Sequence, residues 1–280
     1  MPVKKRIKIS DIIIRVPLWA YAAIVVLPLV WVFSTSLKSN LAFAQAPWTL
    51  FREFQFENYA NAWIKASFSM FAFNSAYITV LAVLISTILT CYTAYALVRL
   101  KFFGSETILM FFIMGLYIPI VLVLPSQFLL MNNMNLLDNH LALILIYVAF
   151  SLPFSILIMT GFMQNIPKEM EEAAHIDGCS YHRAFWSIIM PMSKNGILTI
   201  IIFNFLWIWN DYIIALTMIM SEAKMTLPVG VIAMQQSFRL RADWTTLFAA
   251  LIIVMVPTII IYIIFQKSLQ KGLTLGAVKE

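Results

Sequence analysis

Long runs without a charged residue constrain the fold of this chain more than any other feature. Neither acidic nor basic side chains occur in the stretches 16–37, 66–98, 107–137, 139–167, 195–210, 212–221 and 245–266. Spanning the roughly 30 Å of membrane hydrocarbon takes about 20 residues of α-helix, and in lipid every backbone N–H and C=O needs a partner within the chain. Only 11% of the residues are charged, against roughly 25% in soluble domains. We therefore expect an all-α membrane protein rather than a soluble helical bundle.

These runs predict six transmembrane helices, and prolines within them predict bends. The expected spans cover residues 14–37, 71–98, 107–131, 140–163, 197–220 and 247–266. The first follows a basic lead (1–13) but exceeds the length of a signal-peptide apolar region, so we interpret it as an uncleaved span. The remaining parts are an extracytoplasmic segment (38–70), a five-helix core (71–266) with a loop at 164–196, a further outer loop (221–246) and a tail (267–280).

The distribution of Lys and Arg predicts the orientation of the chain, because loops on the cytoplasmic side carry an excess of these residues. With the N-terminus inside, 13 of the 19 Lys and Arg residues fall in the segments 1–15, 99–101, 164–196 and 267–280. The outer segments hold the other six. Both termini and the loop 164–196 are therefore expected in the cytoplasm.

That loop concentrates charge in a chain that otherwise avoids it. Four of the 13 acidic residues lie between Glu169 and Asp177, where negative charge favours the start of a helix. Asn165 is the expected N-cap and Pro167 a first-turn residue. The small residues that follow favour a slim surface helix.

Gly178 should end this first helix, because glycine accepts the left-handed conformation of a C-terminal cap. Ser180 is then the expected cap of a second helix, which Pro191 should interrupt. Its apolar residues are expected to lie against the spans: Phe185, Trp186, Ile188 and Ile189. The loop is predicted to consist of two helices around a glycine hinge.

The spacing within the loop resembles the EAA motif of binding-protein-dependent ABC transporter permeases, E-A-A-x3-G-x9-I-x-L-P. The matching positions are Glu172, Ala173, Ala174, Gly178, Ile188 and Pro191, with Met190 in place of the usual Leu. The segments WNDY (209–212), TLPVG (226–230), ADW (242–244) and GLTLGAVK (272–279) are similar to the carbohydrate, maltose-type branch of that family. The resemblance covers essentially the whole chain.

The resemblance implies the type I ABC importer permease fold and a set of partners. A cytoplasmic ATPase dimer would bind the ATP and dock on the EAA loop, with Glu172 in a charged contact and Gly178 as the hinge. The C-terminal tail would also approach this ATPase through Gly272, Thr274 and Lys279. The expected assembly includes a second homologous permease subunit and an extracytoplasmic sugar-binding protein, which would contact Gln235, Gln236, Arg239 and Asp243.

Asp211 is the only acidic residue within an expected span, and its role has three alternatives. An acid at this depth usually faces a cavity, so it could line a sugar path together with Trp209, Asn210 and Tyr212. It could instead form a structural hydrogen bond between helices, or lie near the outer interface.

The sequence disfavours several other functions. None of the eight glycines begins a phosphate-binding G-x4-G-K-[ST] loop, and neither an HExxH nor a GxSxG pattern occurs, so we expect no enzyme and no cofactor. Cys91 and Cys179 should not form a disulfide, and no Cys/His cluster suggests a metal. A glycerol-phosphate importer of the same family remains an alternative, as does an ion-coupled secondary transporter, although one intramembrane acid is thin support for the latter.

Overall fold

A computed structural model of the chain describes residues 9–65, 67–100, 102–241 and 243–277. All secondary structure within these ranges is helical, which confirms the predicted all-α class. The chain divides into two compact units. Unit 1 comprises the chain up to residue 68 together with 231–255, and unit 2 comprises 69–230 together with the chain from residue 256 onward.

Unit 1 is organised around the end of its long first helix. Its elements are α1 (Ile9–Ser36), α2 (Asn40–Gln45), α3 (Glu57–Ala60), the π-helical turn η1 (Asn61–Lys65), most of α13 (Leu227–Arg241) and the start of α14 (Trp244–Ala277). The buried Lys38 amine donates to the carbonyl oxygens of Ala46 (3.3 Å) and Pro47 (2.9 Å). Burial lowers the pKa of Lys38, while the nearby Glu53 carboxylate opposes that shift. Lys38 therefore pins the segment after α2 to the end of α1.

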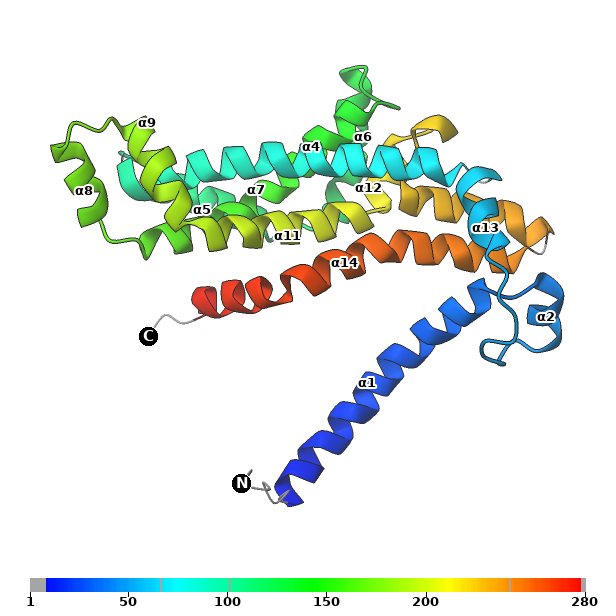
Figure 1. Cartoon of the computed structure of the whole chain (residues 1–280). Coiled ribbons are helices and arrows are strands. Elements are labelled where there is room, and N and C mark those ends of the chain that lie inside the picture. Colours follow the sequence, from blue (N-terminus) through cyan, green and yellow to red (C-terminus); the bar gives the residue numbers. More distant parts are fainter. Residues whose placement is uncertain (1–8, 66, 101, 242, 278–280) are drawn as a thin grey trace. The chain divides into compact units, whose positions relative to one another are not determined.

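Unit 2 contains the longest stretch of continuous chain (Figure 1). Its elements are α4 (Phe68–Tyr95), the π-helical turn η2 (Ala96–Leu100), α5 (Ser105–Gly115), α6 (Ile120–Asn133), α7 (His140–Gln164), α8 (Glu169–Ile176), α9 (Tyr181–Ala184), the π-helical turn η3 (Phe185–Ile189), α10 (Met190–Met192), α11 (Lys194–Asn210), α12 (Ile213–Met218), the short η4 (Glu222–Lys224) and the rest of α14. Helices α8 and α9 lie at one end of α4, α7 and α11, while α6 and α12 lie toward the other (Figure 1).

Two buried apolar clusters hold α4, α7 and α11 together. The larger one joins Ala82 of α4 with Ala142 and Leu143 of α7, all fully buried, and extends to Ile208 of α11. Small residues such as these alanines let membrane helices approach closely, where packing contacts drive association. The second cluster lies nearer α8 and α9 and joins Ala94, Met159, Phe185 and Ile200 among others.

The expected set of six spans is confirmed only in part. Among the described residues, four helices are long and apolar enough to cross a membrane: 14–36, 68–100, 140–164 and 244–266. The third expected span (107–131) is not a straight helix, because α5 and α6 meet at 100° across the break at 116–119, where Pro119 predicts a bend. Pro119 lies directly before α6, and proline cannot continue the hydrogen-bond ladder of a helix.

The fifth expected span (197–220) is also wrong as a continuous helix. Helix α11 ends at Asn210 and α12 begins at Ile213, with the extended backbone of Asp211 between them. A second bend of 75° separates the chain 181–192 from α11. With each bent pair counted as one span, the described residues contain up to six spans.

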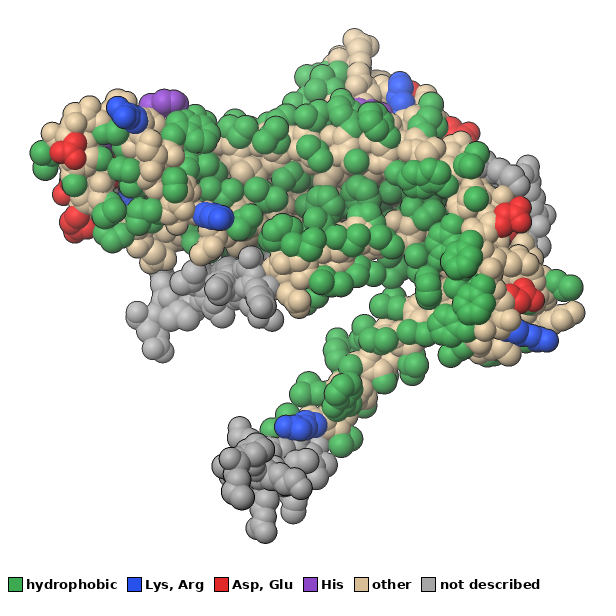
Figure 2. Space-filling view, in the orientation of Figure 1, with side chains coloured by type: hydrophobic (Ala, Val, Ile, Leu, Met, Phe, Trp, Pro, Cys, Tyr) green, Lys and Arg blue, Asp and Glu red, His purple; other side chains and the backbone are tan. Residues whose placement is uncertain are grey.

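Charge is segregated along the face of unit 2 that Figure 2 presents. Hydrophobic side chains cover the middle of its helices, while acidic and basic side chains gather over α8 and α9 at one end (Figure 2). This distribution fits a helical body in lipid whose end projects into water.

The outer loop expected at 221–246 contains the helix α13 over 227–241. The first residues of α13 are fixed on α4. Ser75 Oγ accepts from Leu227 N at 2.8 Å, and Asn74 Nδ2 donates to the carbonyl oxygen of Met225 at 2.9 Å. Gly230 lies so close to α4 that an added Cβ would be 2.3 Å from Cδ2 of Phe71.

Candidate functional site

The acidic loop forms two short helices joined by a tight turn, as the sequence predicts. The N-cap prediction is wrong, however: Asn165 ends α7, and its side chain donates back to the carbonyl oxygen of Gly161 at 3.0 Å. Helix α8 starts instead after Lys168, whose side chain makes no capping bond. Asn165 sits four residues beyond Gly161, so its amide reaches the preceding turn.

Helix α8 has two different faces. Glu172 and Ala173 are exposed together with Glu169 and Ile176, at the i, i+3, i+4, i+7 spacing of one helix face. Glu171 lies on the opposite face and is buried, while Ala174 is half-buried. The helix therefore presents a slim surface on which an acidic group stands beside a large apolar side chain, since Ile176 is 87% exposed.

Gly178 adopts the left-handed conformation predicted for it, with φ at 80°. Its N–H donates to the carbonyl oxygen of His175 (3.0 Å), and the N–H of Cys179 donates to that of Ala174 (2.9 Å). This pair of bonds is the Schellman arrangement at a helix C-terminus. Ser180 then caps α9 by accepting from Arg183 N at 3.4 Å, which confirms that prediction.

The second half of the loop anchors on the membrane helices through two residues. Phe185 and Ile189 are buried, whereas Trp186 is exposed and Ile188 is half-buried, so the predicted apolar face is only partly buried. The ring of Phe185 stacks on that of Tyr92 of α4, with centroids 4.7 Å apart.

Pro191 does not interrupt this second helical segment as predicted. It is exposed and lies in the first turn of α10, where a proline needs no N–H donor. The chain bends after α10, around the buried Ser193.

Asp211 lies in the break between α11 and α12, where its carboxylate has protein partners. Oδ2 accepts from the hydroxyl of Tyr147 in α7 at 2.8 Å and from the backbone N–H of Ala215 at 3.3 Å. The carboxylate thus joins two membrane helices and caps the start of α12. This geometry favours the structural alternative for Asp211.

The neighbours of Asp211 do not gather on one surface. Trp209 is buried, with its ring stacked on Phe205 at 5.6 Å. Asn210 is exposed and donates to the carbonyl oxygen of Leu206 at 2.7 Å, and Tyr212 is also exposed. The structure does not bring the four candidate path residues together.

A cavity of about 310 Å³ lies at the break between α5 and α6. Its lining includes Gly115, Leu116, Ile118, Ile120, Phe150, Ser151, Pro153, Phe154, Phe203, Asn204 and Trp207. Aromatic rings line it beside two polar side chains, and the hydroxyl of Ser151 is buried without a hydrogen-bond partner. Asn204 donates to Ser155 Oγ at 2.9 Å. Aromatic faces with a few polar groups suit sugar rings, whose hydroxyls need hydrogen bonds.

This cavity has no local sequence signal. Its residues come from four helices, and each stands in an apolar run. The one local indication is Pro119, which predicts the break between α5 and α6.

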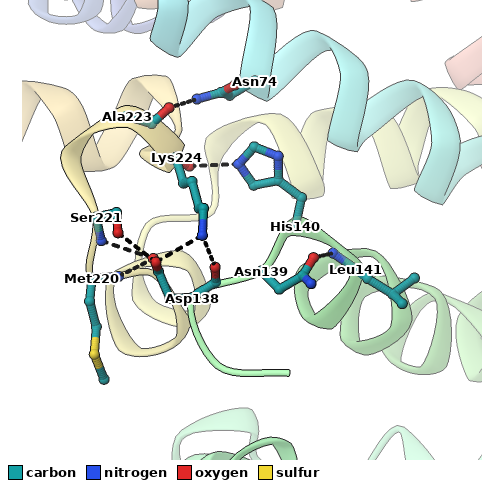
Figure 3. Close-up of polar contacts among 9 residues, drawn as sticks. All are labelled: Asn74, Asp138, Asn139, His140, Leu141, Met220, Ser221, Ala223 and Lys224. Carbon is teal, nitrogen blue, oxygen red and sulfur yellow. Dashed lines mark hydrogen bonds and ion pairs between the residues drawn. The ribbon is translucent and has the colours of Figure 1, made fainter. Parts of the chain in front are cut away.

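A polar cluster around Asp138 lies at the end of unit 2 opposite to α8 and α9 (Figure 3). Its carboxylate accepts from the backbone N–H groups of Met220 (3.0 Å) and Ser221 (2.9 Å), from the Ser221 hydroxyl (2.5 Å) and from Lys224 Nζ (2.9 Å). His140 Nε2 lies 2.9 Å from the carbonyl oxygen of Lys224. Hydrogen bonds lower the pKa of Asp138 far below its ordinary value, and the bond from the Ser221 hydroxyl has the largest effect. The cluster ties the turn before α7 to the segment after α12.

The other predicted contact residues are placed as follows. Asp243 accepts from Asn40 Nδ2 at 2.9 Å and caps the start of α14 through Thr246 N at 3.3 Å. Gln235 is half-buried in α13. Gln236 and Arg239 lie in α13, and Gly272 and Thr274 lie in α14, but their side chains are outside the described part of the structure. Lys279 lies outside the described residues.

Comparison with known proteins gives a consistent set of similarities. The model of a family described as "Binding-protein-dependent transport system inner membrane component" matches residues 86–275. The chain is 34% identical to the diacetylchitobiose uptake system permease protein NgcG of Streptomyces coelicolor, over 91% of this chain and 85% of that protein. It is 31% identical to the trehalose transport system permease protein SugB of Mycobacterium tuberculosis, over 90% and 92% of the two chains.

A similar fold occurs in a solved structure. A chain in the crystal structure of a bacterial ABC transporter involved in the import of the acidic polysaccharide alginate aligns with a TM-score of 0.82. The alignment covers 95% of this chain and 99% of that chain at 24% sequence identity. At this identity the likeness concerns the fold.

Proposed function

The chain belongs to the family of binding-protein-dependent transport system inner membrane components, and from this premise we propose that it is a permease subunit of an ATP-driven sugar importer. The membership predicted from the EAA spacing is thereby confirmed. The substrate would be a sugar or oligosaccharide carried across the cytoplasmic membrane of a bacterium. The chain itself would be no enzyme, because ATP would be bound and hydrolysed by a partner.

The exposed face of α8 is the observation that carries this proposal. Glu172 and Ala173 stand free on a short helix whose C-terminus is fixed by the turn at Gly178. Such a helix moves as a rigid element, so a docked ATPase dimer could displace it as one body. Glu172 would make the charged contact, Ala173 and Ala174 would keep the helix slim, and Ile188 and Pro191 would set the course of the following segment.

The aromatic cavity at the α5–α6 break is the better candidate for a sugar path than residues 209–212. Its polar groups, Ser151 and Asn204, stand among aromatic rings, whereas Asp211 is engaged by Tyr147. The described lining carries no cationic side chain, which disfavours glycerol phosphate as the substrate. Relatives named for diacetylchitobiose and for trehalose support a sugar.

The remaining partners are proposed on the family relationship. A second permease subunit would complete the membrane assembly, and an extracytoplasmic binding protein would deliver the sugar near Gln235, Gln236, Arg239 and Asp243. The tail with Gly272, Thr274 and Lys279 would approach the ATPase. In this arrangement both termini would be cytoplasmic.

Co-purification and uptake test the proposal together. The chain is expressed with its genomic neighbours in vesicles, and ATP-dependent uptake of labelled trehalose and diacetylchitobiose is measured alongside recovery of an ATPase subunit. Glu172→Lys should abolish recovery of the ATPase and uptake while the chain stays inserted. Glu222→Lys makes the same charge change at an exposed residue of η4, outside the docking face, and serves as the matched control. Normal ATPase recovery with Glu172→Lys would refute the docking role.

A further inference from the structure

A buried polar contact connects α8 with the membrane helices on the side opposite its exposed face. Glu171 Oε1 accepts a short hydrogen bond from the hydroxyl of Tyr95, the last residue of α4. Glu171 Oε2 lies 3.6 Å from Nε of Arg99, which belongs to the π-helical turn η2. The side chains of Arg99 and Glu171 are 4% and 10% exposed. In the described part of the chain, these are the polar side-chain contacts from α8 to α4 and η2.

Arg99 extends the contact to a third element. Its Nη2 donates to the carbonyl oxygens of Met163 (2.9 Å) and Ile166 (2.7 Å), at the end of α7 and in the turn that follows. One guanidinium therefore holds α7 with one edge and the α8 carboxylate with another. The planar fork of arginine suits such a junction, because its donors point in fixed directions.

Directional bonds and apolar contacts respond differently when a helix is displaced. Phe185 and Ile189 pack on α4 through apolar surfaces, which resist compression but slide under shear. Hydrogen bonds and a buried ion pair lose strength steeply as distance and angle change, so the groups that they join move together. The α8 carboxylate is thus the attachment through which a pull on α8 reaches α4 and α7.

We propose that Tyr95, Arg99 and Glu171 form the joint that passes displacement of α8 to α4 and α7. Glu171 is a positioning residue: it faces away from the surface on which an ATPase would dock and acts through Arg99 and Tyr95. This inference rests on the proposed function, since it takes α8 as the element that the ATPase moves. The inference assigns different roles to two neighbouring glutamates of α8: Glu172 contacts the ATPase, and Glu171 transmits the movement.

A fluorescent reporter on α4 tests the joint without knowledge of the sugar. Leu89 of α4 is exposed, and Leu89→Cys labelled with an environment-sensitive dye reports movement of α4. Cys179→Ser removes the accessible native thiol, and Cys91 is buried. The signal is recorded in the full complex before and after addition of ATP. Glu171→Gln should lower the ATP-dependent signal change about 5-fold or more, the size of a typical coupling effect, with the ATPase still bound.

Glu222→Gln is the matched control, because it removes the same charge from an exposed residue of η4, outside the docking face of α8, and should leave the signal change intact. A Glu171→Gln complex with the full signal change overturns the joint, as does a native complex whose label does not respond to ATP. Loss of ATPase binding in Glu171→Gln also overturns it, because the residue then serves docking. Failure of the native chain to bind any ATPase instead refutes the proposed function.

A double variant keeps the test decisive if Glu171→Gln leaves Arg99 as a lone buried charge and the protein unfolds. Arg99→Met with Glu171→Leu removes both charges at once, and replacing a buried ion pair with apolar groups often preserves stability. The double variant should fold, bind the ATPase and show the same reduced signal change. A full signal change in this variant would show that apolar packing alone transmits the movement.

Discussion

Replacing Gly230 with alanine is expected to destabilise unit 2, because the new side chain forces the first residues of α13 away from Phe71 of α4. The new Cβ would lie 2.3 Å from Cδ2 and 2.6 Å from Cε2 of Phe71. Carbon atoms in ordinary contact are about 3.5 Å apart or more, so the ring or the helix would have to shift by about 1.2 Å. Phe71 is buried, with 3% of its surface exposed, so its ring cannot simply move into solvent.

Two opposing effects set the size of the change. Overpacking a well-packed site costs roughly 1–3 kcal/mol, while alanine in a helix is favoured over glycine by up to about 1 kcal/mol. Because a shift of about 1.2 Å puts the cost in the upper part of that range, about 2–3 kcal/mol, the net loss in free energy of unfolding should be about 1–2 kcal/mol. Thermal unfolding of the purified protein in detergent, followed by size-exclusion chromatography of the folded fraction, measures it.

Gly161→Ala is the matched control for this substitution. Gly161 lies within α7, and no atom would come within 4 Å of an added Cβ, so this variant should be as stable as the native protein or slightly more stable. A Gly230→Ala/Phe71→Leu double variant should lose less stability than the sum of its single variants, since the shorter side chain relieves the clash. Native-like unfolding of Gly230→Ala would refute the reasoning.

Three other substitutions test contacts of unit 2. Asp138→Asn should lower the melting temperature most above pH ~4, the unfolded-state pKa of Asp; the folded-state pKa lies far lower, so the stability from the carboxylate declines progressively below pH ~4 and the difference in melting temperature should narrow, without closing, as pH falls from 7 to 3. Tyr147→Phe should cost about 1–3 kcal/mol by removing the hydroxyl donor of Asp211, whereas Tyr212→Phe should not; equal melting temperatures would contradict this. Gly178→Ala should strain the turn by about 1–2 kcal/mol and accelerate hydrogen exchange at the Cys179 amide; unchanged exchange would speak against it.

Local signals in the sequence predict the loop 164–196 well where a residue has one conformational role. A glycine followed two residues later by a serine predicts the end of α8 and the start of α9, and both are confirmed. Asn165 misleads because asparagine serves equally at the end of one helix and at the start of the next. Its side chain bonds back to Gly161, so it closes α7.

Contacts between distant parts of the chain are what the sequence does not predict. Asp211 stands out as an intramembrane acid, but its partner Tyr147 is 64 residues away in an apolar run. The sequence gives no signal for Asp138, which lies in a short polar loop. Its carboxylate nevertheless accepts hydrogen bonds from the segment after α12. The sequence does not distinguish Glu171 from the neighbouring Glu169 and Glu172; only the structure shows that it is buried against Tyr95.

The π-helical turn η2 makes the backbone geometry around Arg99 as consequential as the identity of its neighbours. A π-helical turn holds one more residue than an α-helical turn, and one residue corresponds to about 100° of rotation around a helix axis. If η2 became a regular α-helical turn with its five residues unchanged, the residues after it would rotate by up to about 100°, and the guanidinium would turn away from Glu171 with all three polar partners still present. For this chain, a substitution that removes the π-helical turn would therefore disrupt the contact without altering Tyr95, Arg99 or Glu171.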